Sequence, residues 1–235
     1  MPLKILAVSD QIDPRIHSAS LRVREPDVSL VLGCGDIPAR YLEFLADALD
    51  RPVYFVYGNH LEEVTRRGFA GKRYEPMGCE DIGGRVVTDS STGLIIAGVP
   101  GSPKYSKDDA QQYTETEIRW MLLKMAPRLL LNRLRHGRAL DVLVTHSPPR
   151  HLNDREDIPH RGFETLRTFL KLAKPRYQFH GHIHVYDRTQ PTETTFHETR
   201  IVNVYPFRFV DVDISVIGGE RERSPAPAGA ANADV

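Results

Sequence analysis

The chain has 235 residues, with 31 lysines and arginines against 31 aspartates and glutamates. This balance gives no overall field to attract a polyanion, so we do not expect duplex nucleic acid or an anionic membrane as a partner. No apolar stretch reaches membrane-spanning length, and the amino terminus lacks the basic-then-apolar pattern of a secretory signal. The two cysteines, Cys34 and Cys79, do not form a disulfide framework. We therefore expect a cytoplasmic protein with reduced thiols.

A chain of this length can hold one α/β domain with a full core, whereas two separate domains would each be small. We predict a single domain over residues 1–217. From Gly218 the composition shifts to Gly, Arg, Glu, Ser, Pro and Ala, which favours a disordered tail over residues 218–235.

Five short apolar segments have the length and composition of buried parallel strands, and each is followed by a residue type that binds metals. In open α/β sheets the carboxyl ends of such strands meet at one edge, where ligands bind. The sequence therefore predicts a metal site at this edge. The segments are residues 4–9 before Asp10, 29–34 before Asp36, 53–57 before Asn59 and His60, 141–145 before His146, and 177–180 before His182 and His184.

Three helices are expected between these strands. The first begins at Pro38 and continues to residue 49, because apolar residues recur there at helical spacing. The second begins near Thr114, which has capping-box spacing with Glu117, and Pro127 should kink or split it before the stop at Gly137. The third covers residues 163–173.

Three further segments complete the chain. Residues 85–87 and 94–97 form a hairpin around a turn at residues 89–91. Residues 101–112 lack periodicity and form a loop over the site. Residues 200–217 alternate well enough for one or two closing strands.

The residues after the strands have complementary chemistry. His182 and His184, two residues apart, can diverge toward two ions when they lie on a turn. The Asp36 carboxylate can bridge two cations, as in two-metal hydrolytic sites. Asn59 offers a neutral oxygen ligand, and His60 is placed to reach a substrate.

In this order the residues resemble the calcineurin-like metallophosphoesterases, whose pattern is D-x-H, G-D, G-N-H-(D/E), H and then G-H-x-H. The resemblance covers residues 4–184 and looks like the small cytosolic branch, through residues 145–149 and residues 160–162. It implies an α/β fold of four layers, αββα, in which a β-sandwich is flanked by helices.

The resemblance also implies two metal positions that share one carboxylate: Asp10, Asp36 and His184 for the first, and Asp36, Asn59, His146 and His182 for the second. His60 would be the histidine that stabilises the phosphoryl transition state or protonates the leaving oxygen. The reaction implied is attack of a metal-bridging hydroxide on the phosphorus of a phosphodiester or a phosphomonoester.

Two residues depart from the family pattern. Ile12 replaces the histidine of D-x-H, and Leu61 replaces the acid after G-N-H. Asp13 or His17 is a candidate replacement ligand, although Asp13 and the proline after it are also typical of a turn. With fewer nitrogen ligands, two divalent ions of the harder kind are expected, Mn²⁺ first, with Fe or Zn as alternatives.

Other histidines and arginines have simpler interpretations. His180 lies within a strand and is predicted to be a core or supporting histidine. His160, Arg150 and Arg161 are candidates for substrate binding, and Arg15 is a further candidate for contacting a phosphate. The histidines predicted to lie on the surface are His17, His136, His151 and His197.

The predicted substrate is a phosphodiester of modest size, such as a cyclic nucleotide, because no long insertion indicates a capping domain. The alternative is a catalytically weakened protein of the same fold that serves as a binding or scaffold protein, and the absent D-x-H histidine is its best support. A nuclease is less favoured, because there is no basic insertion bearing aromatic residues. The sequence does not predict an oligomeric state.

Overall fold

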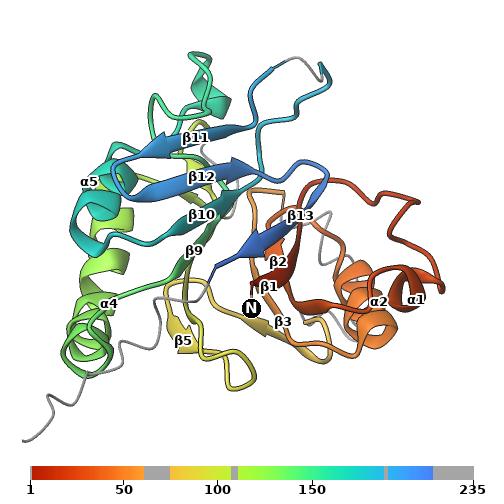
Figure 1. Cartoon of the computed structure of the whole chain (residues 1–235). Helices are drawn as coiled ribbons and strands as arrows, with labels where there is room; N and C mark the ends of the chain where they lie inside the picture. The colour runs from red at the N-terminus through yellow and green to blue at the C-terminus, as the bar shows by residue number, and fades with distance from the viewer. Residues whose placement is uncertain (1, 61–74, 107–110, 188–189, 214–235) are drawn as a thin grey trace, which may run out of the picture.

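The computed structural model describes residues 2–60, 75–106, 111–187 and 190–213, and two large sheets pack face to face in it (Figure 1). The first sheet has the order β13-β1-β2-β3-β4. Strands β1 to β4 are parallel, and β13 is antiparallel to β1. Its strands are β1 (Leu3–Val8), β2 (Val28–Cys34), β3 (Val53–Val56), β4 (Cys79–Asp81) and β13 (Phe207–Val212).

The second sheet has the order β11-β12-β10-β9-β6-β5. Its four inner strands are parallel and its two edge strands are antiparallel to their neighbours. Its strands are β5 (Val86–Thr88), β6 (Ile95–Val99), β9 (Val142–Thr145), β10 (Tyr177–His180), β11 (Glu193–Phe196) and β12 (Thr199–Asn203). A separate short pair joins β7 (Ser102–Pro103) to β8 (Gln112–Tyr113).

Helices cover the outer face of each sheet. On the first sheet lie α1 (Leu21–Arg24) and α2 (Ala39–Leu49), and on the second lie α4 (Glu115–His136) and α5 (Glu164–Ala173). A short 3₁₀ helix, η2 (Ile158–His160), precedes α5. The layers are therefore helix, sheet, sheet, helix, which confirms the predicted fold class (Figure 1).

Successive residues of the central strands point into different cores, as the strand period of two requires. Ile5 and Leu30 lie between the two sheets with Phe179. Leu6 and Val31, their neighbours in sequence, pack under α2. Because both faces of each sheet are covered, the inner strands are apolar almost throughout, which is why they could be recognised in the sequence.

The helix is not split at Pro127, because α4 is one continuous helix from Glu115 to His136. Pro127 lies on the exposed side of the helix, while Met125 and Leu129 are buried in the core against the second sheet. Packing of these side chains therefore outweighs the one backbone hydrogen bond that proline removes. The capping box of Thr114 and Glu117 begins this helix, and Gly137, in the left-handed conformation, ends it, both as predicted.

The remaining predictions for described residues are mostly confirmed. The hairpin is β5 with β6, and two closing strands follow residue 198, one in each sheet. The short strands β4, β7, β8 and β11 were not predicted, and β7 and β8 pair at the two ends of the segment 101–112 that was predicted as a loop. Cys34 is buried and Cys79 is half-buried, with no disulfide between them. None of the helices in the described ranges is long and apolar enough to cross a membrane. The predicted tail, residues 218–235, lies outside the described residues.

Candidate metal centre

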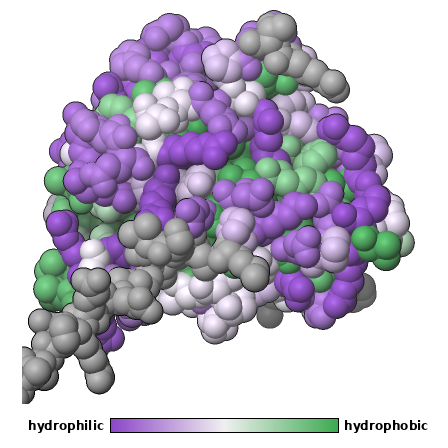
Figure 2. All heavy atoms as spheres, in the orientation of Figure 1, coloured by the Kyte–Doolittle hydropathy of each residue, from purple (hydrophilic) through white to green (hydrophobic). Residues whose placement is uncertain are grey.

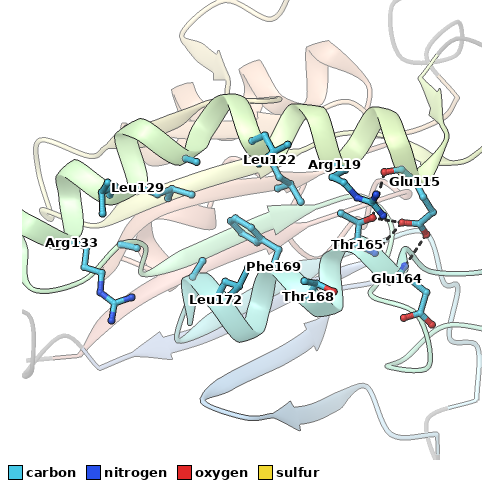
Figure 3. Close-up of a pocket in the computed structure, with 15 residues that line it drawn as sticks. Glu115, Arg119, Leu122, Leu129, Arg133, Glu164, Thr165, Thr168, Phe169 and Leu172 are labelled. Carbon is cyan, nitrogen blue, oxygen red and sulfur yellow. Dashed lines mark hydrogen bonds between the residues drawn. The ribbon is translucent and has the colours of Figure 1, made fainter.

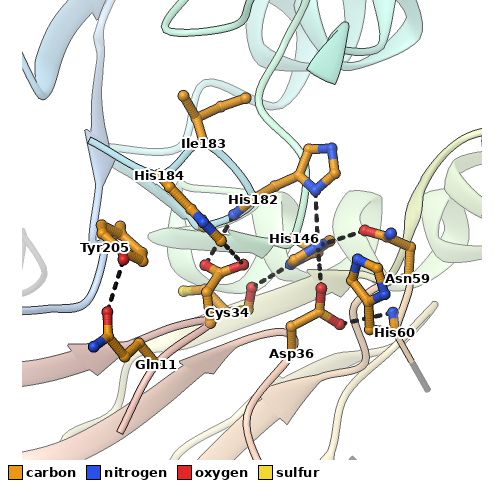
Figure 4. Close-up of polar contacts among 12 residues, drawn as sticks. Gln11, Cys34, Asp36, Asn59, His60, His146, His182, Ile183, His184 and Tyr205 are labelled. Carbon is orange, nitrogen blue, oxygen red and sulfur yellow. Dashed lines mark hydrogen bonds and ion pairs between the residues drawn. The ribbon is translucent and has the colours of Figure 1, made fainter. Parts of the chain in front are cut away.

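The carboxyl ends of five strands meet at one edge of the sandwich, and the residues that follow them face one another (Figure 4). The strands are β1, β2 and β3 of the first sheet and β9 and β10 of the second. Ligand atoms of Asp10, Asp36 and His146 all lie within 4.8 Å of one another. The structure thus brings together residues that are up to 174 positions apart, from Asp10 to His184.

The second predicted metal position is built around Nε2 of His146. This atom lies 2.9 Å from Oδ1 of Asn59, 3.1 Å from Oδ2 of Asp36 and 3.1 Å from Nδ1 of His182. Each imidazole is held from behind by a backbone carbonyl. Nδ1–H of His146 donates to the oxygen of Cys34 at 2.9 Å, and Nε2–H of His182 donates to that of Pro159 at 2.7 Å.

These anchors decide which nitrogen faces the site. With the N–H group of each ring committed to a carbonyl, the opposite nitrogen presents a lone pair, as metal-ligating histidines do. The Asn59 amide is oriented in the same way, because its nitrogen donates to the Tyr105 hydroxyl at 3.0 Å and leaves Oδ1 facing inward.

The converging atoms are therefore all acceptors. Two imidazole nitrogens, an amide oxygen and a carboxylate oxygen cannot be satisfied by one another, because none of them supplies a donor. A cation must balance them, either a proton on His146 or a metal ion. Nitrogen and oxygen donors of this kind are the ligands that divalent metals take in proteins, so the residues fit the implied group.

The pKa values reflect this convergence. Burial lowers the pKa of His146, but the charge and hydrogen bond of Asp36, with a contribution from Asp10, raise it to about 9. Burial raises the pKa of Asp36, but His146 and the His60 backbone amide lower it to about 2. Burial and the charge of His146 lower the pKa of His182 to about 3. Without a metal ion, His146 thus holds the proton that balances the centre.

The first predicted metal position is more open. Oδ2 of Asp10 accepts a hydrogen bond from the His182 backbone at 3.0 Å, and Oδ1 lies 3.4 Å from Nε2 of His184. The His184 ring stacks on Tyr205 with 4.5 Å between centroids, and its Nδ1 lies 3.1 Å from the Tyr186 hydroxyl. The His184 side chain is 43% exposed, so this position is in contact with solvent.

Neither candidate replacement for the missing histidine reaches the site. The carboxylate of Asp13 is paired with the guanidinium of Arg15 at 2.8 Å. The ring of His17 packs edge-on against Tyr41 and Phe44. Ile12 itself lies in the cavity wall beside Asp10.

Three glycines make room for the predicted ligands. A Cβ on Gly35 would lie 2.3 Å from Nδ1 of His146, and one on Gly58 would lie 2.1 Å from Oδ1 of Asp36. One on Gly181 would lie 2.5 Å from Cβ of Ser9. The glycines of the G-D, G-N-H and G-H-x-H segments are therefore required by close packing around the centre.

The backbone is strained at three of the predicted ligands. Asp10, Asp36 and His182 have φ values of 61°, 52° and 65°, in the left-handed region that non-glycine residues seldom adopt. Such conformations cost free energy and persist where the surrounding structure requires them. They turn the chain sharply after each strand, which points the side chains toward one another.

A cavity of about 560 Å³ opens over the centre. His60 lies on its wall, and the His60 backbone amide donates to Oδ1 of Asp36 at 2.9 Å, so the histidine ring is carried beside the shared carboxylate (Figure 4). The cavity is lined by Asp10, Gln11, Ile12, Asp36, Pro38, Asn59, His60, Tyr105, Pro159, His160, His182 and His184.

The loop from residue 150 to residue 161 holds one wall of the cavity. The Arg150 guanidinium, a candidate phosphate ligand, instead binds Asp154 at 2.7 Å and Glu156 at 2.6 Å within the loop. Arg155 ties the loop to the metal centre by donating to the backbone oxygen of His184 at 2.7 Å. Arg150 thus braces the segment that presents the carbonyl of Pro159 and the ring of His160.

Of the other histidines and arginines considered in the sequence, some line the cavity and some lie outside it. His160 lines the cavity, and its Nδ1 contacts the carboxylate of Asp157. Arg161 lies outside the cavity lining, and its Nε donates to the backbone oxygen of Glu156 at 2.9 Å. His180 is buried in β10, also outside the lining, with its pKa lowered to about 4 by burial. The histidines predicted to lie on the surface, His17, His136, His151 and His197, are all exposed.

Sequence reasoning missed two contributors to the site, Tyr105 and Pro159. Tyr105 orients Asn59 and lies in the segment predicted as a loop over the site. Pro159 acts through its backbone carbonyl, which has no signature in the sequence.

The family to which the chain belongs is one of metal-dependent phosphoester hydrolases. Residues 4–186 match the family described as calcineurin-like phosphoesterase, and the chain belongs to that family. Among solved structures, TT1561 of Thermus thermophilus is similar in fold, with 14% identity and a TM-score of 0.57, over 91% of this chain and 100% of that one. A second crystal structure has 16% identity and a TM-score of 0.58, over 90% of this chain and 95% of that one. The search of curated proteins gave no significant match.

Proposed function

We propose that the protein hydrolyses a small phosphodiester, with a cyclic nucleotide as the leading candidate, in the cavity over a centre of two divalent metal ions. The observation that carries this proposal is the convergence of acceptor atoms from Asp36, Asn59, His146 and His182 on one point beneath that cavity. Mn²⁺ is the ion we favour, because Asp10, Asp36 and Asn59 contribute oxygen ligands and the first position has only one imidazole.

Each residue has a distinct task. Asp10, Asp36 and His184 would hold the first ion, and Asp36 would share the second with Asn59, His146 and His182. When bound, two such ions would lower the pKa of bound water and offset the negative charge of the phosphoryl group. His60, whose ring is placed beside the Asp36 carboxylate, donates a hydrogen bond to a phosphoryl or leaving oxygen.

The size and lining of the cavity support a small substrate. A volume of about 560 Å³ lies within the range of pockets that enclose small molecules. Ile12 and Tyr105 add apolar surface beside the polar centre, which suits a substrate with an organic group on the phosphate. The chain has no excess of basic residues to hold a long polyanion.

The proposal is tested with bis(p-nitrophenyl) phosphate and added Mn²⁺. We expect turnover by the native chain and loss of turnover in Asp36→Ala and His60→Ala. His197→Ala is the matched control, because His197 is exposed and outside the cavity lining. A native chain that binds Mn²⁺ but does not hydrolyse this ester would refute the proposal.

A substrate panel then separates the ester classes. Cyclic nucleotides, p-nitrophenyl phosphate and a single-stranded oligonucleotide are compared at equal concentration. Faster turnover of a cyclic nucleotide than of the other two supports the assignment. Preference for the monoester would instead indicate a phosphatase, and cleavage of the oligonucleotide would indicate a nuclease.

One observation favours a second candidate function. Ile12 is 38% exposed in the cavity wall and cannot bind a metal, so the first position lacks a side-chain ligand that the family pattern supplies. In this alternative the protein is a catalytically weakened binding or scaffold protein. It predicts one bound metal ion per chain and no turnover with any ester of the panel.

A further inference from the structure

His184 differs from the two buried histidines of the metal centre in what holds its ring. His146 and His182 each donate a hydrogen bond to a backbone carbonyl. The His184 ring is held by side chains instead. It stacks on Tyr205, with 4.5 Å between the ring centroids and 16° between the ring planes, and its Nδ1 lies 3.1 Å from the Tyr186 hydroxyl. These side chains therefore decide where Nε2 of His184 points.

Tyr205 is the better anchored of these two aromatic residues. Tyr186 is 79% exposed, whereas Tyr205 is half-buried. The Tyr205 hydroxyl donates to Oε1 of Gln11 at 2.7 Å (Figure 4), and the Tyr205 backbone amide donates to Oδ1 of Asn203 at 3.0 Å. Because Gln11 is the residue after Asp10, Tyr205 is bonded to one ligand segment of the first metal position and stacked on the other.

Asn203 holds both Tyr205 and the segment that carries His184. It lies at the end of β12, beside the end of β10, and is 1% exposed. Its Nδ2 donates to the backbone oxygen of Ile183 at 2.8 Å, while its Oδ1 accepts from the backbone amide of Tyr205. An amide side chain can do this because it offers a donor and an acceptor together. One buried amide thus fixes the backbone on both sides of the stacked pair.

We propose that Tyr205, set in place by Asn203, is a positioning residue that aims Nε2 of His184 at the first metal ion. This nitrogen lies 3.4 Å from Oδ1 of Asp10, a separation at which both atoms can bind one ion at ordinary metal–ligand distances of about 2 Å. Asn203 and Tyr205 lie outside residues 4–186, the part of the chain that matches the family. This role rests on the two-metal centre of the proposed function.

The exposure of His184 gives this support its importance. Its side chain is 43% exposed, so without a neighbour the ring would turn among several rotamers. Ordering such a ring when an ion binds costs conformational entropy. The aromatic face of Tyr205 restricts the ring before the ion arrives. Residues that orient a metal ligand in this way typically contribute about 10- to 100-fold to metal affinity.

Calorimetric titration of Mn²⁺ into the chelator-treated full chain tests this role without any ester. Tyr205→Leu removes the aromatic face, and we expect it to lower the affinity for the weaker ion by about tenfold or more while the tighter ion binds as in the native chain. Tyr205→Phe keeps the face and loses only the hydrogen bond to Gln11. Its affinity for the weaker ion should therefore stay within about threefold of the native value.

Two further variants separate positioning from a general loss of structure. Asn203→Asp keeps the size of the side chain but replaces the group that donates to Ile183 by an oxygen, so it should weaken binding of the same ion. In a His184→Ala background, Tyr205→Leu should have no further effect on Mn²⁺ affinity, because the imidazole that it positions is absent.

A groove between α4 and α5 supplies the matched control (Figure 3). Its lining is mainly apolar, and none of its lining residues lines the cavity over the metal centre. Figure 2 shows hydrophobic residues at the left edge of the molecule, where Figure 1 places α4. Phe169→Leu removes an aromatic ring from this groove, as Tyr205→Leu does beside the metal centre. It should leave both Mn²⁺ affinities at the native values.

Several results would overturn the role of Tyr205. They are a native chain that binds fewer than two Mn²⁺ ions, native affinities in Tyr205→Leu or Asn203→Asp, and equal losses in Tyr205→Leu and Tyr205→Phe. An effect of Tyr205→Leu that persists in the His184→Ala background, or weaker binding in Phe169→Leu, would do the same. A chain that binds both ions and shows the expected pattern but hydrolyses no ester refutes only the proposed function, because the calorimetry does not depend on turnover.

Discussion

The two predicted metal positions differ in how firmly the fold holds the residues assigned to them. At the second position His146, His182 and Asn59 are 0%, 6% and 5% exposed, and each is oriented by a hydrogen bond on its far side. At the first position the side chain of His184 is 43% exposed, and the hydroxyl that contacts its Nδ1 belongs to Tyr186, which is itself 79% exposed. Preorganised ligands lose less entropy on binding. We therefore expect the second position to bind its ion more tightly.

The histidine that the D-x-H pattern lacks here belongs to the first position, which is expected to bind its ion less tightly. Ile12 removes a ligand from the position that is already more exposed, whereas every residue that the family pattern implies for the second position is present. Loss of the ligand at position 12 therefore need not empty the second position. Asp36 connects them, since its carboxylate faces His146 and belongs to both predicted sets.

Replacing the shared carboxylate should have the largest effect. Asp36→Ala removes the oxygen donor common to both positions and the charge that balances His146, so we expect loss of metal from both and a fall in turnover of about 10³-fold or more. Elemental analysis of the purified variant measures the metal, and bis(p-nitrophenyl) phosphate hydrolysis measures the turnover. A variant that retains two ions per chain would show that Asp36 does not bridge them.

The next largest effect is expected at His60. The structure places this ring in the cavity wall but gives it no part in the cluster of acceptor atoms. His60→Ala should therefore lower turnover by about 10²- to 10⁴-fold, the usual range for loss of a general acid or base. The metal content should stay at the native level. Loss of metal together with activity would instead make His60 a ligand.

The convergence of these residues could be predicted because they follow recognisable strands. Asp10, Asp36 and His146 come directly after apolar segments, and the parallel arrangement of those segments fixes which end of the sheet they reach. The sequence does not indicate which sheet a strand joins. β12 and β13 are neighbours in the chain, yet β12 is an inner strand of the second sheet and β13 is an edge strand of the first.

The parts that could not be predicted depend on backbone groups and on local ion pairs. The carbonyls of Cys34 and Pro159 orient the two buried imidazoles, but every residue has a carbonyl, so sequence cannot single them out. Arg150 was a reasonable phosphate candidate by residue type. Its actual partners, Asp154 and Glu156, became evident only from the path of the loop.

Restoring the missing histidine at position 12 should reduce the difference in metal affinity between the two predicted positions. Ile12→His adds an imidazole to the wall of the cavity beside Asp10, and we expect the affinity of the weaker ion to rise by about tenfold. Isothermal titration with Mn²⁺ into chelator-treated protein measures both affinities. Ile12→Ala is the control, because it removes the same side chain without adding a nitrogen. Equal affinities for the two variants would mean that position 12 does not face the first ion.

The smallest expected effect is on the pH dependence of stability in metal-free protein, through the proton on His146 that balances the charge of Asp36. The pKa of His146 is raised from 6.5 to about 9, so the stability it contributes is complete below pH 6.5 and is lost as the pH rises through 9. The pKa of Asp36 is lowered from 3.8 to about 2, so its contribution is complete above pH 3.8 and is lost as the pH falls through 2. With respect to this pair, chelator-treated protein should therefore be most stable between pH 3.8 and pH 6.5.

A metal ion must displace that proton before it can bind Nε2 of His146. At pH 7, which lies below the His146 pKa of about 9, binding at the second position should release about one proton per chain. Release is measured by titrating Mn²⁺ in two buffers of different ionisation enthalpy. His146→Gln supplies the control, because it has no proton to release in this range. Release of this proton only with the weaker binding event would place the tighter ion at the first position and would contradict the expected order of affinities.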